Sequence, residues 1–431
     1  MQVLLLSGGS GKRLWPLSNE VRSKQFLQVL KSPSGESESM VQRVYRQIRE
    51  AGITSELTIA SNRGQKESLQ MQLGSSVNLV LEPERRDTFP AIALACTFLH
   101  LKKNVPLDEV VVVLPVDVYA DLDYFKTLIE MEKVILNGEA DMALMGITPD
   151  SPSEKYGYIL PEENIRENVI RVKGFSEKPD TARAQMLVDE GAFWNGGVFA
   201  FSLGYLLKDE KFLSRCDSFE QRLEDYGQLK KTSFDYEVVE QCDSLAMVPY
   251  SGQWKDLGSW NVLTSVIENS PSDTILIEED FGNTHIINEL DIPVLALGTK
   301  NMIICSSFDG ILVADLDHCS NLKEHAQKLT AKPRREQFLW GSSHIVDITR
   351  LPDGTEAPLH RIVVNGGMTS DVLLDNDSSS VLTILFGNGE ISIDDEKKEI
   401  ERGDVLEVAK GVSYRLSAES EMVVLKLPVV P

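Results

Sequence analysis

The chain is poor in cysteine and in basic residues, and it contains no long hydrophobic run. Its five cysteines are an odd number, lie far apart and form no CxxC pair, so we expect reduced thiols, mostly small core residues, and neither a disulfide framework nor a zinc site. Lys and Arg number 43 against 66 Asp and Glu, and the formal net charge of −23 argues against a surface for nucleic acid or an anionic membrane. Any anionic ligand must therefore be held by local cations.

No apolar stretch approaches the roughly 20 residues that a membrane-spanning helix needs. The apolar run at the start of the sequence also lacks the basic preamble and cleavage site of a secretion signal. We therefore expect a cytoplasmic protein without a membrane partner. A chain of 431 residues, 42% hydrophobic and 25% charged, is long enough for two or three ordinary globular domains.

Residues 1–265 alternate between strand-like and helical segments. The strand-like runs at 2–6, 57–60, 77–81 and 110–114 are apolar without polar alternation, as expected where helices cover both faces of a sheet. The pattern predicts a Rossmann-like α/β domain with a mixed, mostly parallel sheet. Open sheets of this kind bind ligands beyond the carboxyl ends of their strands.

Two further regions follow this domain. Residues 266–333 contain short strand-like pieces and a helical stretch near 321–329, which predicts a β-rich connector with a linker helix. Residues 334–431 again consist of strand-like runs separated by glycine-containing turns, and they predict a small all-β sandwich or barrel. One of these turns lies at Gly387-Asn388-Gly389, within the sequence ILFGNGEISI.

The most informative segment is LLLSGGSGKRL, residues 4–14, in which an apolar strand breaks into glycines and is followed by two cations. Glycines let backbone N–H groups approach an anion closely, and Lys12 and Arg13 add positive charge, so the segment predicts a phosphate-binding loop. It is not a Walker loop, because Arg13 stands where that motif needs Ser or Thr. It is not a dinucleotide fingerprint either, because Leu14 replaces the third glycine.

Acidic and polar side chains in later segments are candidates to complete a binding site together with this glycine loop. Asp117 follows the strand at 110–114, and together with Asp256 in WKDLGSW it offers two carboxylates for a magnesium ion that also contacts phosphates. In GFSEKP, Lys178 is suited to hold a phosphate and Glu177 to accept hydrogen bonds from sugar hydroxyls. The side-chain amide of Asn195 can both donate and accept hydrogen bonds, as recognition of sugar hydroxyls requires. Taken singly, each of these residues also has an ordinary structural role, as a helix cap or in a solvated turn.

Together these segments resemble the bacterial mannose-1-phosphate guanylyltransferase family. The run SGGSGKRLWPLSNEVRSKQFL is similar to the family's AGGxGxRLWPLSRxxxPKQF, EPERRDTFPAIALA to EPxxRNTAPAIALA, and LPVDVYADLDYF to LPADHxI. The segments GFSEKPD, FWNGGVFAF, TSFDYEVVE and WKDLGSW then follow in the family's order. Ser23, Asp87, Phe89 and Val118 depart from the family pattern, and two of them lie in the segment expected near the base or sugar.

The resemblance implies a role for each matching residue. The nucleotide would be bound by Ser7, Gly8, Gly9, Gly11, Glu82, Arg86, Asp87 and Thr88, and its phosphates also by Arg13 and Lys24. Lys178 would hold the sugar phosphate, and Gly157, Glu177 and Asn195 would line the sugar. Asp117 and Asp256 would hold the cofactor Mg²⁺.

The implied reaction is transfer of a guanylyl group from GTP to α-D-mannose 1-phosphate, giving GDP-mannose and pyrophosphate. A phosphate oxygen is already anionic at neutral pH, so the attack needs alignment and charge neutralisation and no general base. Two alternatives stay open: another sugar 1-phosphate, such as a manno-heptose or fucose derivative, or another base, and a catalytically idle sugar-nucleotide regulator. A homodimer is compatible with the sequence, which does not define the oligomeric state.

The carboxyl-terminal region resembles the cupin-type isomerase domain of some family members at Trp340-Gly341, in the strand and turn at 361–367 and in ILFGNGEISI, which the resemblance implies is a glycine hairpin. The metal ligands of that domain are missing. Where that domain has a histidine-rich run, this chain has VLLDNDS from Val372, and Tyr414 replaces a later histidine. His344 and His360 are expected to be ordinary surface or core histidines. We therefore expect a cupin-like domain without isomerase activity that serves assembly or regulation.

Overall fold

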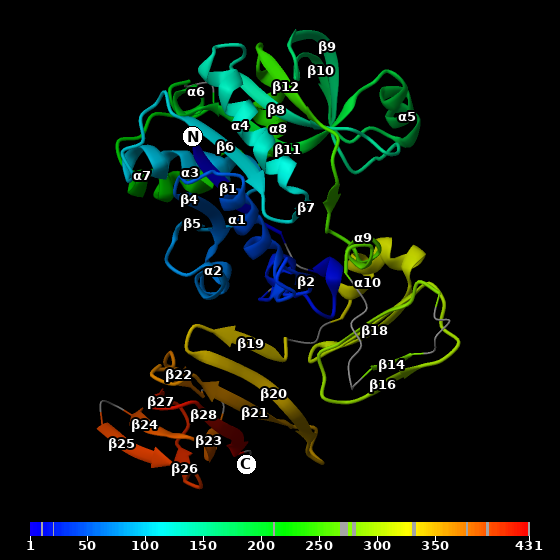
Figure 1. Ribbon diagram of the computed structural model, residues 1–431. Helices are drawn as coiled ribbons and strands as arrows, with labels where there is room; N and C mark the ends of the chain where they lie inside the picture. Colours follow the sequence, from blue (N-terminus) through cyan, green and yellow to red (C-terminus); the bar gives the residue numbers. More distant parts are fainter. Residues whose placement is uncertain are drawn as a thin grey trace. The chain divides into compact units, whose positions relative to one another are not determined.

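The computed structural model describes residues 1–9, 12–19, 21–209, 212–267, 275–277, 282–329, 333–375, 378–393 and 396–429. The chain forms two compact units (Figure 1). The first comprises Met1–Arg13 and Ser23–Glu268, and the second comprises Leu14–Arg22 and Asn269–Pro431.

The first unit is built on a nine-stranded sheet. In spatial order its strands are β5 (Val77–Glu82), β4 (Leu57–Asn62), β1 (Gln2–Ser7), β6 (Val110–Pro115), β11 (Phe193–Ser202), β8 (Met142–Ile147), β12 (Leu245–Tyr250), β10 (Val169–Ser176) and β9 (Tyr158–Arg166). The strands from β5 to β6 are parallel, β11 is antiparallel to β6 and β8, and β12 is parallel to β8. This mixed sheet in an α/β domain confirms the predicted fold class.

Helices cover both faces of this sheet (Figure 1). The helices of this unit are α1 (Met40–Glu50), α2 (Lys66–Leu73), α3 (Thr88–Leu101), α4 (Leu122–Leu136), α5 (Thr181–Asp189), α6 (Leu203–Leu207), α7 (Phe219–Glu224), α8 (Phe234–Glu237) and α9 (Trp260–Thr264), with 3₁₀ turns at η1 (Lys12–Leu14), η2 (Lys24–Phe26), η3 (Arg63–Gln65), η4 (Asp225–Gln228) and η5 (Val239–Gln241). Two-residue strands β2 (Leu30–Lys31) and β3 (Ser37–Glu38) pair beside α1.

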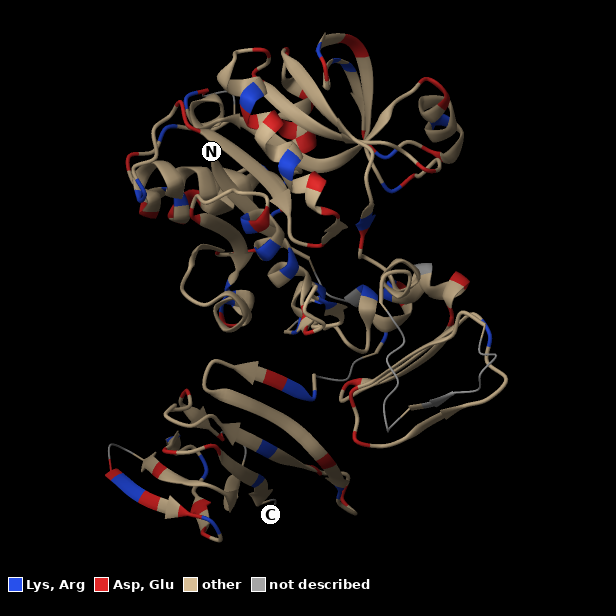
Figure 2. Ribbon diagram, in the orientation of Figure 1, with Lys and Arg blue, Asp and Glu red and all other residues tan. Residues whose placement is uncertain are grey.

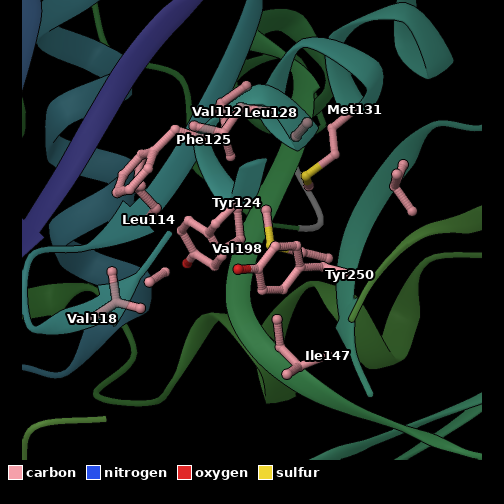
Figure 3. Packing of buried hydrophobic residues seen from close by; sticks show 14 of the residues in the cluster. Val112, Leu114, Val118, Tyr124, Phe125, Leu128, Met131, Ile147, Val198 and Tyr250 are labelled. Carbon is pink, nitrogen blue, oxygen red and sulfur yellow. The ribbon is translucent and has the colours of Figure 1, made fainter. Parts of the chain in front are cut away.

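The central strands are buried on both faces because their side chains alternate between two cores. Val112 and Leu114 of β6 pack with Tyr124 and Leu128 of α4, as Figure 3 shows. Val113, between them, packs in the other core, which includes the apolar residues of α3. The uninterrupted apolar runs of the sequence thus reflect a sheet covered on both sides. Figure 2 shows that Lys, Arg, Asp and Glu gather mainly on helices and loops.

The second unit begins with the β-rich connector predicted from the sequence. Strands β14 (Ile275–Ile277) and β16 (Val294–Ala296) pair in parallel, and a three-stranded sheet contains β15 (His285–Asn288), β17 (Met302–Ser307) and β18 (Gly310–Asp315). The 3₁₀ turn η6 (Leu316–Asn321) and helix α10 (Leu322–Ala326) follow.

The segment Leu14–Arg22 belongs to this second unit. Asn19 Nδ2 donates to Asp309 Oδ2 at 2.6 Å, and the Arg22 guanidinium donates two bonds of 2.7 Å to the Glu289 carboxylate. The backbone oxygen of Pro16 accepts a bond of 2.8 Å from the Ser307 hydroxyl. The chain therefore leaves the first unit directly after Arg13 and returns at Ser23.

The remainder of the second unit is a two-sheet β structure. One sheet has the order β19 (Arg335–Phe338), β20 (Gly341–Arg350), β21 (Glu356–Val364), β28 (Met422–Val429), β23 (Ser379–Phe386) and β26 (Val405–Val408); the other has the order β22 (Leu373–Leu374), β27 (Ser413–Ala418), β24 (Asn388–Ile393) and β25 (Glu396–Glu401). Both sheets contribute to one apolar core that contains Trp340, Ile391 and Tyr414. This confirms the expected all-β region.

The hairpin predicted for ILFGNGEISI is wrong. Strands β23 and β24 flank Gly387 but belong to different sheets and do not pair with each other. A Cβ on Gly387 would lie 2.2 Å from the backbone oxygen of Glu421, and the φ of Gly387 is +81°. The glycine therefore lets the chain cross between the sheets at close range, a function that the sequence does not distinguish from a tight turn.

Two further findings concern segments and residues named in the sequence. All five cysteines are free, and three of them, Cys96, Cys305 and Cys319, are buried, which confirms that they are mostly core thiols. In the part of the chain that the structure describes, no helix combines the length and apolar character needed to cross a bilayer.

Candidate active site

A cavity of about 350 Å³ opens at the carboxyl ends of the parallel strands of the first unit. Eight of the residues predicted to contact the substrates line it: Ser7, Gly8, Gly9, Glu82, Arg86, Asp87, Thr88 and Asp117. Arg85, Gly197 and Asp235 also line it and were not predicted. The edge of the sheet at which the sequence placed the site is therefore the edge that carries the cavity.

The glycine loop borders open space. A Cβ added to Gly8 or Gly9 would meet no atom within 4 Å, and Gly9 has a φ of +122°, which an L side chain rarely adopts. The loop can thus present backbone N–H groups to an anion without steric hindrance. Gly11, predicted as part of this loop, lies outside the described residues.

A network of buried hydrogen bonds holds the start of the glycine loop in place. Ser7 Oγ accepts a bond of 3.1 Å from Gln25 Nε2 and donates to Gln65 Oε1 at 3.3 Å. Gln65 Nε2 in turn donates to Ser23 Oγ at 2.8 Å. The Ser7 hydroxyl thus anchors the loop, and Ser23, which departs from the family's proline, satisfies a buried amide.

Lys24 and two aspartates form the charged centre of the site. Lys24 Nζ lies 2.6 Å from Asp117 Oδ2 and 3.5 Å from Asp256 Oδ1. Burial lowers the pKa of Lys24, but the charges of the two carboxylates outweigh it and leave the pKa raised. Burial and the charge of Asp117 raise the pKa of Asp256, while Lys24 and the exposed Arg13 oppose that shift.

Local backbone pairing explains how the two aspartates meet. Strand β7 (Val118–Ala120) pairs antiparallel with β13 (Trp254–Asp256), and Val118 is opposite Asp256. The backbone N–H of Leu257 also donates to the backbone oxygen of Asp117 at 3.3 Å. This small sheet places two carboxylates, distant in sequence, at one point.

These carboxylates fit a magnesium ion. Oxygen ligands from one or two carboxylates, completed by phosphate oxygens and water, are the usual protein environment of Mg²⁺. Burial, and after it the charge of Asp117, raise the pKa of Asp256, so a cation beside this pair favours the charged form of Asp256. Within the described residues, no group of three or more His, Cys, Asp or Glu side chains could hold a metal without such additional ligands.

The predicted sugar-binding residues lie next to one another. The Glu177 side chain is 7% exposed and forms an ion pair with Lys178, whose own side chain is 60% exposed. Burial opposes the charge of Lys178, but the hydrogen bond and charge of Glu177 raise its pKa. A Cβ on Gly157 would lie 2.4 Å from Glu177 Oε2, so only glycine leaves room for that carboxylate.

Asp235, which the sequence reasoning missed, joins this group to the cavity. Its Oδ1 accepts a bond of 2.6 Å from Asn195 Nδ2, while Asn195 Oδ1 accepts one of 3.0 Å from the backbone N–H of Gly197. Burial and the nearby charge of Glu177 raise the pKa of Asp235 to about 6. The signal available in the sequence was the acidic residue of TSFDYEVVE, a segment that matches the family's order but to which the sequence alone assigns no role.

Aromatic rings close the space between the predicted sugar and metal residues. The Tyr156 ring centroid lies 4.9 Å from that of Trp194 and 5.2 Å from that of Trp254. Tyr156 precedes Gly157, Trp194 precedes Asn195, and Trp254 begins the strand that ends at Asp256. The cluster thus fixes three functional segments against one another.

The predicted base-binding segment is held by residues far along the chain. Tyr226 Oη donates to Glu82 Oε1 at 2.5 Å, and burial raises the pKa of Glu82. The Arg86 guanidinium donates to the backbone oxygen of Leu229 at 2.9 Å and to Glu84 at 2.8 Å. Arg86 therefore positions the wall of the cavity, and Arg85 is the additional cation along it.

Asp87 and Thr88 begin helix α3 at this end of the cavity. Asp87 caps the helix by accepting a bond of 2.8 Å from the backbone N–H of Thr88, and its φ is +73°. Thr88 Oγ1 accepts from the backbone N–H of Phe234 at 2.8 Å. The cap, the strained backbone and the link to the Asp235 segment fix the start of α3 in place.

In the carboxyl-terminal sheets, the region where the resembling isomerase domain has its metal ligands contains different side chains. Lys426 forms an ion pair with Asp375, which lies in the segment that replaces the family's histidine-rich run. Tyr414 is buried in the apolar core, and burial lowers the pKa of both His344 and His360. An ammonium group thus neutralises the carboxylate at this place.

Comparison with known proteins agrees with the geometry. A model of the family described as Nucleotidyl transferase matches residues 2–272. The mannose-1-phosphate guanylyltransferase of Salmonella muenchen is 30% identical over 77% of this chain and 74% of its own length. The xanthan biosynthesis protein XanB of Xanthomonas campestris pv. campestris (strain B100) is 29% identical over 96% and 91%, respectively.

A solved structure described as mannose-1-phosphate geranyltransferase from Thermus thermophilus matches with a TM-score of 0.63 and 27% identity. That match covers 77% of this chain and 99% of the other. The chain therefore belongs to the nucleotidyl transferase family, and its relatives place it with the mannose-1-phosphate guanylyltransferases. Transfer of a nucleotidyl group to a sugar phosphate is the reaction class of this site.

Proposed function

We propose that the protein transfers a guanylyl group from GTP to α-D-mannose 1-phosphate, forming GDP-mannose and pyrophosphate. The observation that carries the proposal is the convergence of Lys24, Asp117 and Asp256 beside the glycine-loop cavity. Relatives that match most of the chain are named mannose-1-phosphate guanylyltransferases, which supports guanine and mannose as the base and sugar.

The reaction is an in-line exchange at the α-phosphorus of GTP. A phosphate oxygen of mannose 1-phosphate forms the new P–O bond, the bond to the β-phosphate oxygen breaks, and pyrophosphate leaves with that electron pair. The nucleophile is already anionic, so no side chain has to remove a proton. The task of the protein is to align two polyanions and to reduce their repulsion.

The chain's own cations and N–H groups perform this task. Gly8 and Gly9 present the loop backbone to the nucleotide phosphates, and Arg13 and Lys24 stabilise the departing pyrophosphate. Lys178 holds the phosphate of the sugar in line. Asp117 and Asp256 would hold Mg²⁺, which would supply charge neutralisation at the phosphates.

Sugar and base recognition belong to the two ends of the site. Glu177, Asn195 and Asp235 provide acceptors and a donor for sugar hydroxyls. Asn195 and Asp235 are held by their bond to each other, and Glu177 is held by its ion pair with Lys178. At the other end, Asp87 bonds the N–H of Thr88 through one oxygen. We assign its carboxylate to the N1–H and exocyclic amine of guanine, groups that adenine and pyrimidines do not present together.

A pyrophosphate-release screen tests the proposal. Each of the four nucleoside triphosphates is combined with mannose 1-phosphate, glucose 1-phosphate, fucose 1-phosphate and a manno-heptose 1-phosphate, with Mg²⁺ or with EDTA. The expected result is fastest release with GTP and mannose 1-phosphate, and none with EDTA. A higher kcat/KM for another pair would replace the assigned substrates, and no release with any pair would identify an idle regulator.

A further inference from the structure

A second cavity, of about 440 Å³, lies in the first unit at the end of α3 opposite to the active site. Thr88 and Ala91 at the start of α3 line the nucleotide cavity, whereas Thr97, His100 and Leu101 near its end line this one. Helix α3 packs against α6 and α7 here, with the Phe98 and Phe219 rings 5.5 Å apart (Figure 1). The two cavities are therefore separate sites on one helix.

A buried arginine lines this cavity, and no carboxylate in the described part of the chain forms an ion pair with it. Arg222 is 3% exposed, and its Nη2 donates to the backbone oxygen of Ser214 at 2.5 Å. Its Nε is buried and has no hydrogen-bond partner. A buried guanidinium without a counter-charge lowers the stability of the fold unless a ligand provides that charge. A bound anion beside Arg222 is therefore favoured.

The rim adds to the positive charge. Lys208 and Arg215 line the same cavity, and among the described lining residues the one acid is Asp217, whose Oδ1 lies 3.9 Å from Arg215 Nε. Of the lining side chains that the structure describes, three are cations and one is an acid, in a chain with a formal net charge of −23. The local electrostatic potential therefore favours an anion where the protein as a whole repels one.

The remaining walls indicate what the anion is attached to. His100 Nδ1 lies 3.0 Å from the backbone oxygen of Val105, which places the proton of the neutral ring on Nδ1 and leaves Nε2 as an acceptor. Leu101, Leu107 and Leu213 supply apolar surface. An acceptor and an apolar wall beside three cations suit a hydroxylated carbon skeleton that carries a phosphate.

We propose that this cavity is a second ligand site, which binds a phosphomonoester of a small hydroxylated molecule, such as a sugar phosphate. The phosphate bonds to Arg222, with Lys208 and Arg215 as additional cations, and a hydroxyl donates to His100 Nε2. The volume matches the lower part of the range for small-molecule sites, roughly 300–1,000 Å³. The site is independent of the substrates proposed for the nucleotide cavity.

Calorimetric titration of the full chain with ribose 5-phosphate tests this site, with ribose as the uncharged control ligand. The rim double variant Lys208→Ser/Arg215→Ser changes only exposed side chains. It is expected to weaken binding about tenfold or more, because two charge-assisted contacts to the phosphate are lost. The charge-matched control Lys126→Ser/Lys133→Ser, on α4, is expected to bind as the native chain does.

Two further variants make the outcome decisive. Arg222→Gln is expected to abolish detectable binding, and the rim variant provides the test if Arg222→Gln does not fold. Lys178→Gln, at the active site, is expected to leave the affinity unchanged. The proposal is overturned if ribose binds as well as its phosphate, if neither the rim variant nor Arg222→Gln weakens binding, or if only Lys178→Gln does.

Discussion

Lys24 Nζ lies 2.6 Å from Asp117 Oδ2. A cation that follows strand β1 and an acid that follows strand β6 therefore meet directly. Asp117→Asn keeps the shape of that side chain and removes its charge. Turnover is expected to fall on the order of 10³-fold at saturating Mg²⁺, because a preorganised charge at the reacting phosphates is lost. Pyrophosphate release measures it.

The control for this change is Asp123→Asn, an exposed carboxylate paired with Lys126 on α4. It removes the same charge from the chain and is expected to leave turnover unchanged. Near-normal turnover of Asp117→Asn would show that the metal and charge role assigned to this residue is incorrect.

Lys178→Gln is expected to raise the KM for the sugar phosphate by about tenfold or more, since a charge-assisted hydrogen bond is removed. The KM for the nucleotide should change little, because Lys178 lies with the sugar-binding residues and pairs with Glu177. Lys173→Gln, at an exposed position on strand β10, which ends two residues before Lys178, is the matched control. An equal rise in both KM values would contradict the assignment.

Asp235 makes the stability of the fold depend on pH. Its pKa is raised from 3.8 to about 6, so its contribution to folding is fully present below pH 3.8 and is lost as the pH rises through about 6. The free energy of unfolding of the native chain, relative to Asp235→Asn, should therefore decrease between about pH 4 and pH 7. Urea unfolding of both proteins measures it, and a pH-independent difference would argue against a raised pKa.

Ser23→Ala is expected to destabilise the first unit by about 1–3 kcal/mol, because Gln65 Nε2 loses its partner inside a buried network. Chemical denaturation of the two proteins gives the difference. Ser34→Ala, at an exposed loop position, removes the same hydroxyl without a buried partner and should be neutral. Equal stabilities of native and Ser23→Ala proteins would remove the anchoring role from this network.

The carboxyl-terminal domain is expected to have no isomerase activity. Lys426 pairs with Asp375 where the resembling isomerases have a histidine-rich metal run, and zinc ligation would have to displace that ammonium. A coupled assay for conversion of mannose 6-phosphate to fructose 6-phosphate, with added Zn²⁺, measures this. Zinc-dependent conversion by the purified chain would refute the expectation.

Much of the fold was accessible from the sequence because local pattern determined it. The apolar run at 110–114 has no polar alternation, and β6 is indeed covered on both faces. The glycine loop and Asp117 were placed at the correct sheet edge, since the carboxyl ends of parallel strands share an edge.

Other features depend on long-range pairing that no local pattern encodes. Tyr226 bonds Glu82 from 144 positions away, and Asp235 reaches Asn195 only because α8 and the bulged strand β11 adjoin the same cavity. The glycine at 387 shows the same limit, because a turn residue looks alike in sequence whether it closes a hairpin or carries the chain between two sheets.

The excursion of residues 14–22 has a practical consequence for dissecting this protein. A fragment that stops after residue 267 would retain every predicted active-site residue, yet it would lack Glu289, Ser307 and Asp309, which hold that excursion. Arg13 stands directly before it and Lys24 two residues after it, so an untethered loop would join these two residues. Isolated as a fragment, the first unit would have its sequence motifs intact and two of its key charges poorly positioned.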